Sequence, residues 1–338
     1  MKFGPVPIEE ALGKVLAHKL FDADGRKLLN KGHRLIADDL DLLRRLDMHM
    51  VIVADLAPTD LDENAAARRV GHALVGEGLQ VRAPGVGRAN LHATVAGPLR
   101  INVPVLNRLN NIDEGITIAT LQEHTLVQAG QQIALVKIIP FGMVAARVED
   151  VEAVAREYAP VLSVRALQPH RVGLIVSGPA HARDHMLEDF TPPVRTRMER
   201  LGSQLDQVRY VAHTAEALAD GIRQQIGACD LIILAGISAT IDREDVIPLA
   251  LRAAGGGVAH FGVPVDPGSL LMLGYIDHKP VLGAPGCVRS LKTNVVDLIL
   301  PRLLAGERLT RADLVAMGHG GLLKDISERP MPRDLPDE

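Results

Sequence analysis

The second half of the chain alternates short apolar runs with longer segments in which apolar residues recur every three or four positions. A short continuous apolar run predicts a buried strand, and the three-to-four spacing predicts an amphipathic helix. Strands that alternate with helices in this way indicate βαβ units and a parallel sheet. Pro192 and Pro193 are expected in the first turn of their helix, where a missing N–H costs least. The predicted strands are 172–176, 208–211 and 231–234, and the predicted helices are 190–201, 215–226 and 288–300.

The first half of the chain carries a more interrupted pattern. Helical spacing predicts helices over residues 8–17 and 35–46, and an apolar run predicts a strand over 49–54. Asp60 is expected to cap the helix that follows it, since its short carboxylate can accept hydrogen bonds from free N–H groups. From residue 81 to about 143, short runs are separated by Gly, Pro and Asn, which indicates a compact β-rich unit.

These patterns predict an α/β protein of several parts. At 338 residues the chain is longer than most single domains. The C-terminal part should form a three-layer αβα domain, and the N-terminal part a mixed α+β region that is partly β-rich. The end of the chain is charged and rich in proline, which is typical of a flexible tail. The expected segments are an N-terminal α/β segment at 1–58, a β-rich α+β region at 59–168, the αβα domain at 169–322 and the tail at 323–338.

Composition narrows the class of function. The formal net charge is −4, aromatic residues make up 2% and Trp is absent, so nucleic acid and membrane surfaces are not expected as partners. Two cysteines, Cys229 and Cys287, fit a reduced compartment better than a disulfide scaffold. No apolar run approaches the ~20 residues that span a bilayer, and no signal peptide is recognisable. A cytoplasmic location is therefore expected.

Three glycine-bearing loops follow apolar runs between residues 230 and 290. Such loops form an anion-binding crevice at the carboxyl ends of parallel strands. In the first of them, Gly236 lets the backbone approach a ligand, and Ser238 and Thr240 offer hydroxyl groups to oxyanions. A turn that only connects a strand to a helix explains the same residues about as well.

An acidic cluster follows directly, at Asp242, Glu244 and Asp245. Carboxylates can hold Mg²⁺ while phosphates supply its other ligands, or they can accept hydrogen bonds from a heterocycle. The alternative is a helix N-terminus, with Asp242 as the cap and Asp245 in the first turn. The spacing slightly favours the helix N-terminus.

The loop 283–286 gives the clearest local signal, because it precedes the helix predicted at 288–300. A glycine there permits an unusual turn, and the free N–H groups of a helix N-terminus attract anions. Arg289, Ser290 and Lys292 add cationic and hydroxyl contacts that suit a phosphate. A plain proline–glycine turn is the alternative.

Other candidates are weaker. The sequence Asp266-Pro267-Gly268 is a turn, in which Asp266 can bond its own backbone. Cys287 lies in the expected anion site, but no partner base is identifiable. His181 and His185 are four residues apart without an evident third ligand, and are interpreted as surface histidines. Motifs of dinucleotide-binding folds, P-loops and α/β-hydrolases are not found.

At these loops the chain resembles molybdopterin-binding proteins, and the resemblance covers most of the sequence. The most similar subgroup is the region that precedes the nucleotidyltransferase domain in molybdenum-cofactor cytidylyltransferase-like fusions, and the transferase itself is not expected here. A more distant similarity is to molybdopterin molybdotransferases and molybdopterin adenylyltransferases. The stretches that carry the resemblance are 110–121, 136–141, 235–248, 263–271 and 281–290.

The resemblance implies a ligand, partners and a set of site residues. The ligand would be molybdopterin or the molybdenum cofactor, and Asp242 and Asp245 would be both the catalytic residues and candidate ligands of Mg²⁺. A molybdoenzyme or a separate nucleotidyltransferase would be the partner, and the chain would form a homo-oligomer. The implied cofactor-binding residues are Ser177, Gly178, Ala235, Gly236, Ile237, Ser238, Asp266, Pro267, Gly268, Gly283, Pro285, Gly286, Arg289 and Ser290.

Three departures from the family pattern bear on catalysis. The family's Ser-Gly-Gly, Pro-Gly-Asn-Pro and Lys-Pro-Gly-Lys-Pro stand here at 235–237, 285–288 and 265–269, and the last of them loses both lysines. The loss of these cations affects molybdate insertion more than pterin binding. The expected function is therefore binding of the cofactor during its maturation or delivery. A molybdotransferase-like enzyme and a ligand sensor on the same fold are the alternatives.

Overall fold

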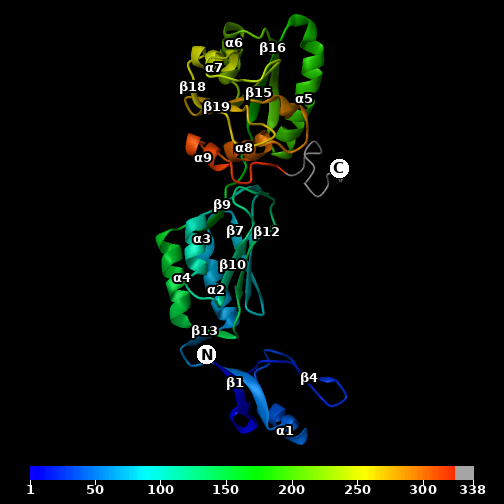
Figure 1. Cartoon of the computed structure of the whole chain (residues 1–338), viewed down its shortest axis with the longest axis vertical. Coiled ribbons are helices and arrows are strands. Elements are labelled where there is room, and N and C mark those ends of the chain that lie inside the picture. Colours follow the sequence, from blue (N-terminus) through cyan, green and yellow to red (C-terminus); the bar gives the residue numbers. More distant parts are fainter. Residues whose placement is uncertain (324–338) are drawn as a thin grey trace, which may run out of the picture. The chain divides into compact units, whose positions relative to one another are not determined.

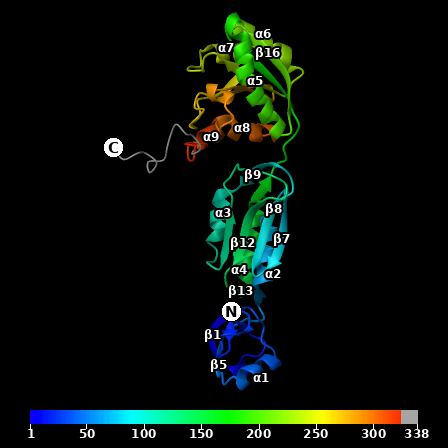
Figure 2. The same ribbon diagram turned by 90° about the vertical axis from the view of Figure 1, so that its right-hand side faces the viewer.

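The computed structural model describes residues 1–323, and the chain divides into two compact units (Figures 1 and 2). Unit 1 is Met1–Arg165, and unit 2 begins at Ala166. Both units contain helices and β-sheets, so the predicted α/β class is confirmed. The boundaries of the four expected segments stay predictions, and the tail lies outside the described residues except for Leu323. Within the described part of the chain, no helix has the length and apolar character needed to cross a membrane.

The N-terminal part of unit 1 is a small antiparallel sheet with strand order β1-β5-β2 and helix α1. The helix expected at 35–46 and the strand expected at 49–54 are confirmed as α1 and β5. The prediction of a helix at 8–17 is wrong. A single 3-10 turn there leads to Gly13, whose φ is +77°, and then to β2, which gains its hydrogen bonds by pairing with β5. The elements are β1 (Lys2–Pro7), η1 (Ile8–Glu10), β2 (Val15–Leu16), β3 (Leu20–Phe21), β4 (Lys27–Leu29), α1 (Ala37–Arg45) and β5 (Met50–Asp55).

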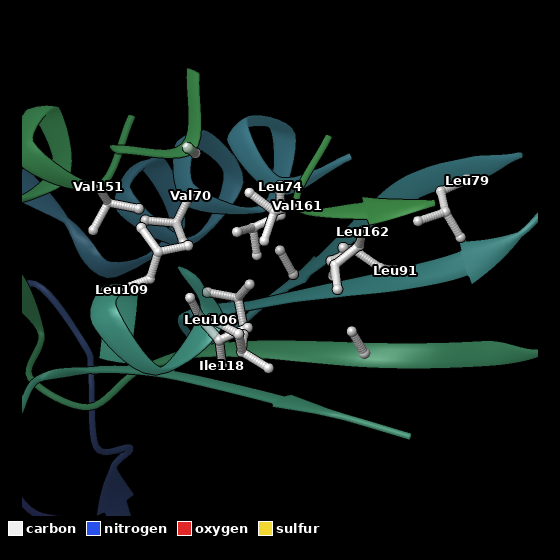
Figure 3. Packing of buried hydrophobic residues seen from close by; sticks show 14 of the residues in the cluster. Val70, Leu74, Leu79, Leu91, Leu106, Leu109, Ile118, Val151, Val161 and Leu162 are labelled. Atoms are coloured by element: carbon white, nitrogen blue, oxygen red, sulfur yellow. The ribbon is translucent and has the colours of Figure 1, made fainter. Parts of the chain in front are cut away.

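The rest of unit 1 contains a four-stranded antiparallel sheet, in the order β10-β12-β8-β7, and α2, α3 and α4 cover one face of it (Figure 1). Leu74, Leu91, Leu109 and Val151 pack between the helices and the sheet (Figure 3). The β-rich character expected after residue 81 is confirmed. The elements are β6 (Asp60–Asp62), α2 (Glu63–Leu74), β7 (Leu79–Gly85), β8 (Arg88–Ala93), β9 (Gly97–Ile101), α3 (Val103–Asn110), β10 (Ile116–Thr120), β11 (Leu126–Val127), β12 (Gln132–Ile138), β13 (Gly142–Val144), α4 (Ala145–Glu157) and β14 (Leu162–Val164).

The cap of α2 is Asp62, so the prediction that Asp60 is the cap is wrong. The Asp62 carboxylate accepts hydrogen bonds from the N–H groups of Asn64 and Ala65, both at 2.9 Å. Asp60 stays extended because β6 pairs with β13, and its carboxylate accepts from the N–H of Ala57 at 2.8 Å. The cap therefore comes at the last extended residue before the helix.

Unit 2 is a three-layer structure on a six-stranded sheet of order β16-β15-β17-β20-β19-β18. Helices α6 and α7 pack on one face, and α5 and α8 lie together on the other (Figure 1). The three-layer αβα prediction is confirmed. The elements are β15 (Arg171–Ser177), η2 (Ala180–Ala182), α5 (Arg183–Arg200), β16 (Gln204–Val211), α6 (Ala215–Ile226), β17 (Leu231–Gly236), α7 (Val246–Ala253), β18 (Gly257–Phe261), β19 (Met272–Ile276), β20 (Lys279–Gly283), η3 (Gly286–Arg289), α8 (Val295–Leu304) and α9 (Arg311–Ala316).

The prediction of a parallel sheet holds for four of these strands only. β16, β15, β17 and β20 are parallel, but β19 and β18 run antiparallel to their neighbours. Only Asp277 and His278 connect β19 to β20, and Asp277 has φ of 54°. So short a connection can make only a hairpin, because a parallel crossover needs a dozen residues or more.

Helix α5 begins earlier than the pattern predicts. It starts at Arg183, so Pro192 and Pro193 lie in its middle and not in its first turn. Proline removes a backbone hydrogen bond, but an apolar stripe along the whole helix is buried against the sheet and outweighs that loss. The buried apolar side chains of the stripe are Met186, Phe190, Val194 and Met198.

The helix predicted at 288–300 is also shifted. Residues 286–289 form the 3-10 turn η3, and the α-helix begins only at Val295. Asn294 stops it from beginning earlier, because its side chain accepts the N–H of Val296 at 3.0 Å in a capping box with Asp297. The expected anion loop therefore leads into a 3-10 turn and not into a long helix.

Candidate functional site

The parallel strands of unit 2 bring the predicted loops to one edge of the sheet. Ser177 at the end of β15 is paired with Gly236 at the end of β17, and Leu234 is paired with Gly283 at the end of β20. The carboxyl ends of these strands, and the loops that follow them, therefore share an edge, which is where open α/β sheets bind ligands. We call it the carboxyl edge.

The turn between β18 and β19 reaches the same edge, since Met272 pairs with both Phe261 and Gly283. Gly268 lies in this turn with φ of +124°, and a Cβ atom there would come within 2.2 Å of Val295 Cγ1. The carbonyl of Pro267 accepts the N–H of Val295 at 3.1 Å. In this structure the turn thus supports the first residue of α8.

Ser177 and Gly236 are packed closely together at the centre of the edge. The Ser177 side chain is fully buried, and its Oγ lies 2.9 Å from Nδ1 of His213 and 3.3 Å from the carbonyl of Ala235. A Cβ atom on Gly236 would lie 2.9 Å from Ser177 Oγ and 3.1 Å from His213 Cε1. Gly236 is therefore required by the close approach of two side chains, and Ser177 holds the His213 ring.

A pocket of about 480 Å³ opens beside this centre, at the ends of β15 and β16. The phenol of Tyr210 donates to the carbonyl of Pro179 at 2.7 Å, and burial raises the pKa of Tyr210, so the phenol stays neutral at physiological pH. Arg183 supplies a cation. The pocket is lined by Gly178, Pro179, Ala180, Arg183, Tyr210, Val211, Ala212 and His213.

Of these residues, only Gly178 was selected from the sequence. Arg183, Tyr210 and His213 lie on or beside elements whose ends reach the carboxyl edge, but they belong to no recognisable motif. The signal that would have found Tyr210 and His213 is positional, since the strand predicted at 208–211 ends at the same edge of the sheet as β15.

The acidic cluster is arranged as a helix N-terminus. Asp245 caps α7: one carboxylate oxygen accepts the N–H of Val246 at 2.7 Å and the other accepts that of Ile241 at 3.1 Å. Asp242 accepts the N–H of Glu244 at 2.8 Å. In the described residues, no group of three or more His, Cys, Asp or Glu side chains is placed to hold a metal ion. The catalytic and Mg²⁺ roles of Asp242 and Asp245 stay predictions.

The loop before the acidic cluster is exposed in part, but Thr240, whose hydroxyl was expected to face an oxyanion, is buried. Ile237 and Ile241 are 56% and 73% exposed, which is unusual for large aliphatic side chains, and Ser238 is exposed beside them. The Ser238 hydroxyl donates to the carbonyl of Ala239 at 3.3 Å. The loop therefore offers an apolar surface next to Gly236.

Arg289, the last residue of the turn η3 after β20, is oriented by three contacts. Its Nε donates to the carbonyl of Gly286 at 3.2 Å, its Nη1 lies 3.4 Å from Asp189 Oδ2, and its guanidinium lies 5.5 Å from the centre of the Phe190 ring. The side chain is 54% exposed. It is thus a held but accessible cation, as phosphate recognition requires.

Arg197, which the sequence did not single out, fixes the loop that carries Arg289 and Ser290. Its side chain is 4% exposed and donates to the carbonyls of Val288 at 2.9 Å and Ser290 at 2.6 Å. It also forms a bidentate ion pair with Asp297, in which Nε donates to Oδ1 at 2.7 Å and Nη2 donates to Oδ2 at 3.1 Å. A buried arginine with this many acceptors clamps η3 and the start of α8 together.

Cys287 is half-buried in this loop, and its partial burial raises the pKa of its thiol. A raised pKa means less thiolate at neutral pH, so the thiol should be a poor nucleophile. We expect iodoacetamide to alkylate Cys287 more slowly than glutathione at neutral pH, with a rate that still increases above pH 9, because deprotonation is displaced to higher pH. Mass spectrometry of a time course measures this, and alkylation as fast as that of glutathione would contradict it.

Comparisons with known proteins found one sequence family over a short stretch of the chain and distant structural similarities. Residues 5–55 match a family described as a domain of unknown function (DUF8806). No curated protein matches the chain significantly. A molybdopterin biosynthesis MoeA protein from Pyrococcus horikosii matches in structure at 14% identity, over 90% of this chain and 75% of that one, with a TM-score of 0.29. A molybdenum cofactor biosynthesis protein from Pyrococcus furiosus matches at 13% identity, over 93% and 65%, with a TM-score of 0.24.

Proposed function

We propose that unit 2 binds molybdopterin or its molybdenum form at the carboxyl edge, and that the protein acts in maturation of this cofactor or in its delivery to a molybdoenzyme. The observation that carries the proposal is the convergence at one edge of loops that resemble those of molybdopterin-binding proteins. Ser177, Gly236, Gly268 and Gly283 all belong to that edge. The two archaeal proteins named above have TM-scores below 0.5, so the proposal rests on the edge itself and on the sequence resemblance.

The charges of the edge suggest how the ligand lies. Arg289 is an accessible cation of the loop 286–290, so the phosphate of the ligand is placed near Arg289 and Ser290. The pterin is placed toward Gly236 and Ser238, where the backbone can be approached closely and Ile237 is exposed. The pocket between Arg183 and His213 adds a mostly apolar space beside the pterin, with the Arg183 cation at its wall.

Binding is favoured over molybdate insertion because the edge lacks cations where the family has them. The turn 265–269 has neither lysine of the family pattern, and both carboxylate oxygens of Asp245 are engaged by the N–H groups of Val246 and Ile241. An enzyme that inserts molybdate would need positive charge near the oxyanion. A carrier needs only to hold the cofactor.

The chain should therefore retain pterin when purified from a host that makes the cofactor. Oxidation of the bound ligand to its fluorescent derivative, followed by chromatography, measures the amount per chain. Retention without molybdate or tungstate incorporation supports a carrier, whereas turnover by the purified chain would replace it with the molybdotransferase-like enzyme. No retained pterin would overturn the proposal and favour a sensor of another ligand.

Replacing Arg289 with glutamine should weaken pterin binding about tenfold, since one charge-assisted hydrogen bond to a phosphate is lost. Titration of the apoprotein with purified molybdopterin measures the dissociation constant. Arg195→Gln is the matched control, because Arg195 is an exposed arginine on α5 outside the η3 loop. Equal affinity in the two variants would place the phosphate elsewhere.

A further inference from the structure

Unit 1 has a groove of its own, about 480 Å³ in volume, between helices α2 and α4. The two helices pack against each other along the face that lies away from the sheet (Figures 1 and 2). Small side chains form part of the groove wall, since Ala155 is buried and Ala73 is half-buried. The groove is lined by Arg68, Arg69, His72, Ala73, Glu152, Ala155, Arg156 and Ala159.

Positive charge dominates this groove. Three arginines face a single glutamate, and Arg69 occupies both oxygens of that Glu152, with Nε to Oε1 at 2.8 Å and Nη2 to Oε2 at 2.7 Å. Neither Arg68 nor Arg156 forms an ion pair with any residue in the described part of the chain. The groove therefore presents two exposed guanidinium groups that no carboxylate contacts directly, although Arg156 lies near enough to Glu152 to help lower the pKa of its carboxyl.

The ordinary stabilisation of helix ends explains only part of this charge. His72 and Arg156 lie in the last turns of α2 and α4, where a cation interacts favourably with the helix dipole. Arg68 lies one turn before His72 on the same face of α2 and outside the last turn, so the dipole does not explain it. Arg68 and Arg156 approach the groove from different helices, as two donors around one ligand would.

We propose that this groove binds a phosphate or diphosphate group of a small ligand. Guanidinium groups suit phosphate oxygens because they donate two parallel hydrogen bonds. Arg68 and Arg156 supply these donors from either side, and His72 supplies a further ring N–H. Arg69 is held by Glu152 and sets the distance between the two helices. The site is separate from the carboxyl edge of unit 2 and does not depend on the function proposed for it.

Calorimetric titration of the full chain with inorganic pyrophosphate tests the proposal. The double variant Arg68→Gln/Arg156→Gln should lose at least about tenfold in affinity at this site, by the loss of two charge-assisted contacts. Arg289→Gln should leave the site intact, so a failure here is distinguishable from a failure at the carboxyl edge. Arg147→Gln, elsewhere on α4, is the matched control and should bind as the wild type.

Circular dichroism melting checks that the double variant is folded, and Arg68→Lys/Arg156→Lys should recover part of the affinity because the charges are restored. Two results would overturn the proposal. One is pyrophosphate affinity unchanged by the double variant. The other is no binding of pyrophosphate to the Arg289→Gln chain, which would mean that the groove holds no phosphate site.

Discussion

Replacing Arg197 with methionine is expected to destabilise unit 2 by about 3 kcal/mol, the low end of the cost of removing one partner from a buried ion pair. The substitution leaves Asp297 without its two guanidinium contacts and leaves the carbonyls of Val288 and Ser290 without donors. Asp297 is 29% exposed and can be partly rehydrated, which keeps the cost below the maximum. Urea unfolding followed by far-ultraviolet circular dichroism measures the change in the transition of unit 2.

Arg195→Met is the control for this prediction, because Arg195 lies on the same helix but is exposed. Its effect should stay within about 0.5 kcal/mol, as for most surface substitutions. If both variants unfolded at the same urea concentration, Arg197 would not clamp the η3 loop. The Arg197→Met variant should also lose pterin binding, since Arg289 and Ser290 lie in the loop that Arg197 holds.

Gly236→Ala is expected to abolish most of the ligand binding of the carboxyl edge, with a loss of at least about tenfold in affinity. The added methyl group would lie 2.9 Å from Ser177 Oγ, closer than such contacts allow, and would displace His213 as well. Because Ser177 is fully buried, the displacement cannot be relieved by moving it into solvent. Pterin content after purification measures the loss.

Gly257→Ala is the matched control, since a Cβ atom at Gly257 would meet no atom within 4 Å. It should retain the pterin content of the wild type and the same melting temperature. Retention of pterin by Gly236→Ala at the wild-type level would show that the ligand does not depend on the arrangement of Ser177, Gly236 and His213.

Local pattern predicted the sheet of unit 2 well, because its central strands are continuous apolar runs and its helices are amphipathic. The strand at 172–176 and the helix at 215–226 are examples. The pattern could not predict the direction of β18 and β19, which depends on the short turn at Asp277 and on pairing between distant residues. It also could not place the start of α8, which one side chain, Asn294, decides by its capping hydrogen bond.

The site was predicted as a set of loops but not as a set of contacts. Glycines in turns are visible in a sequence, and Gly236 and Gly268 prove to be at positions where a side chain would clash. Arg197 and His213 were missed because their roles come from tertiary packing. The arginine is buried against a loop about ninety residues later, and the histidine meets Ser177 at the end of the neighbouring strand. The alternative prediction of a helix N-terminus at the acidic cluster named Asp242 as the cap and placed Asp245 in the first turn. In the structure Asp245 is the cap.

The most direct test of the binding site is the pterin content of the full chain purified from a cofactor-producing host, compared between the wild type, Gly236→Ala and Gly257→Ala. We expect close to one pterin per chain in the wild type and in Gly257→Ala, and little in Gly236→Ala. The absence of pterin from all three proteins, or equal content in all three, would contradict the assignment of the carboxyl edge as the molybdopterin site.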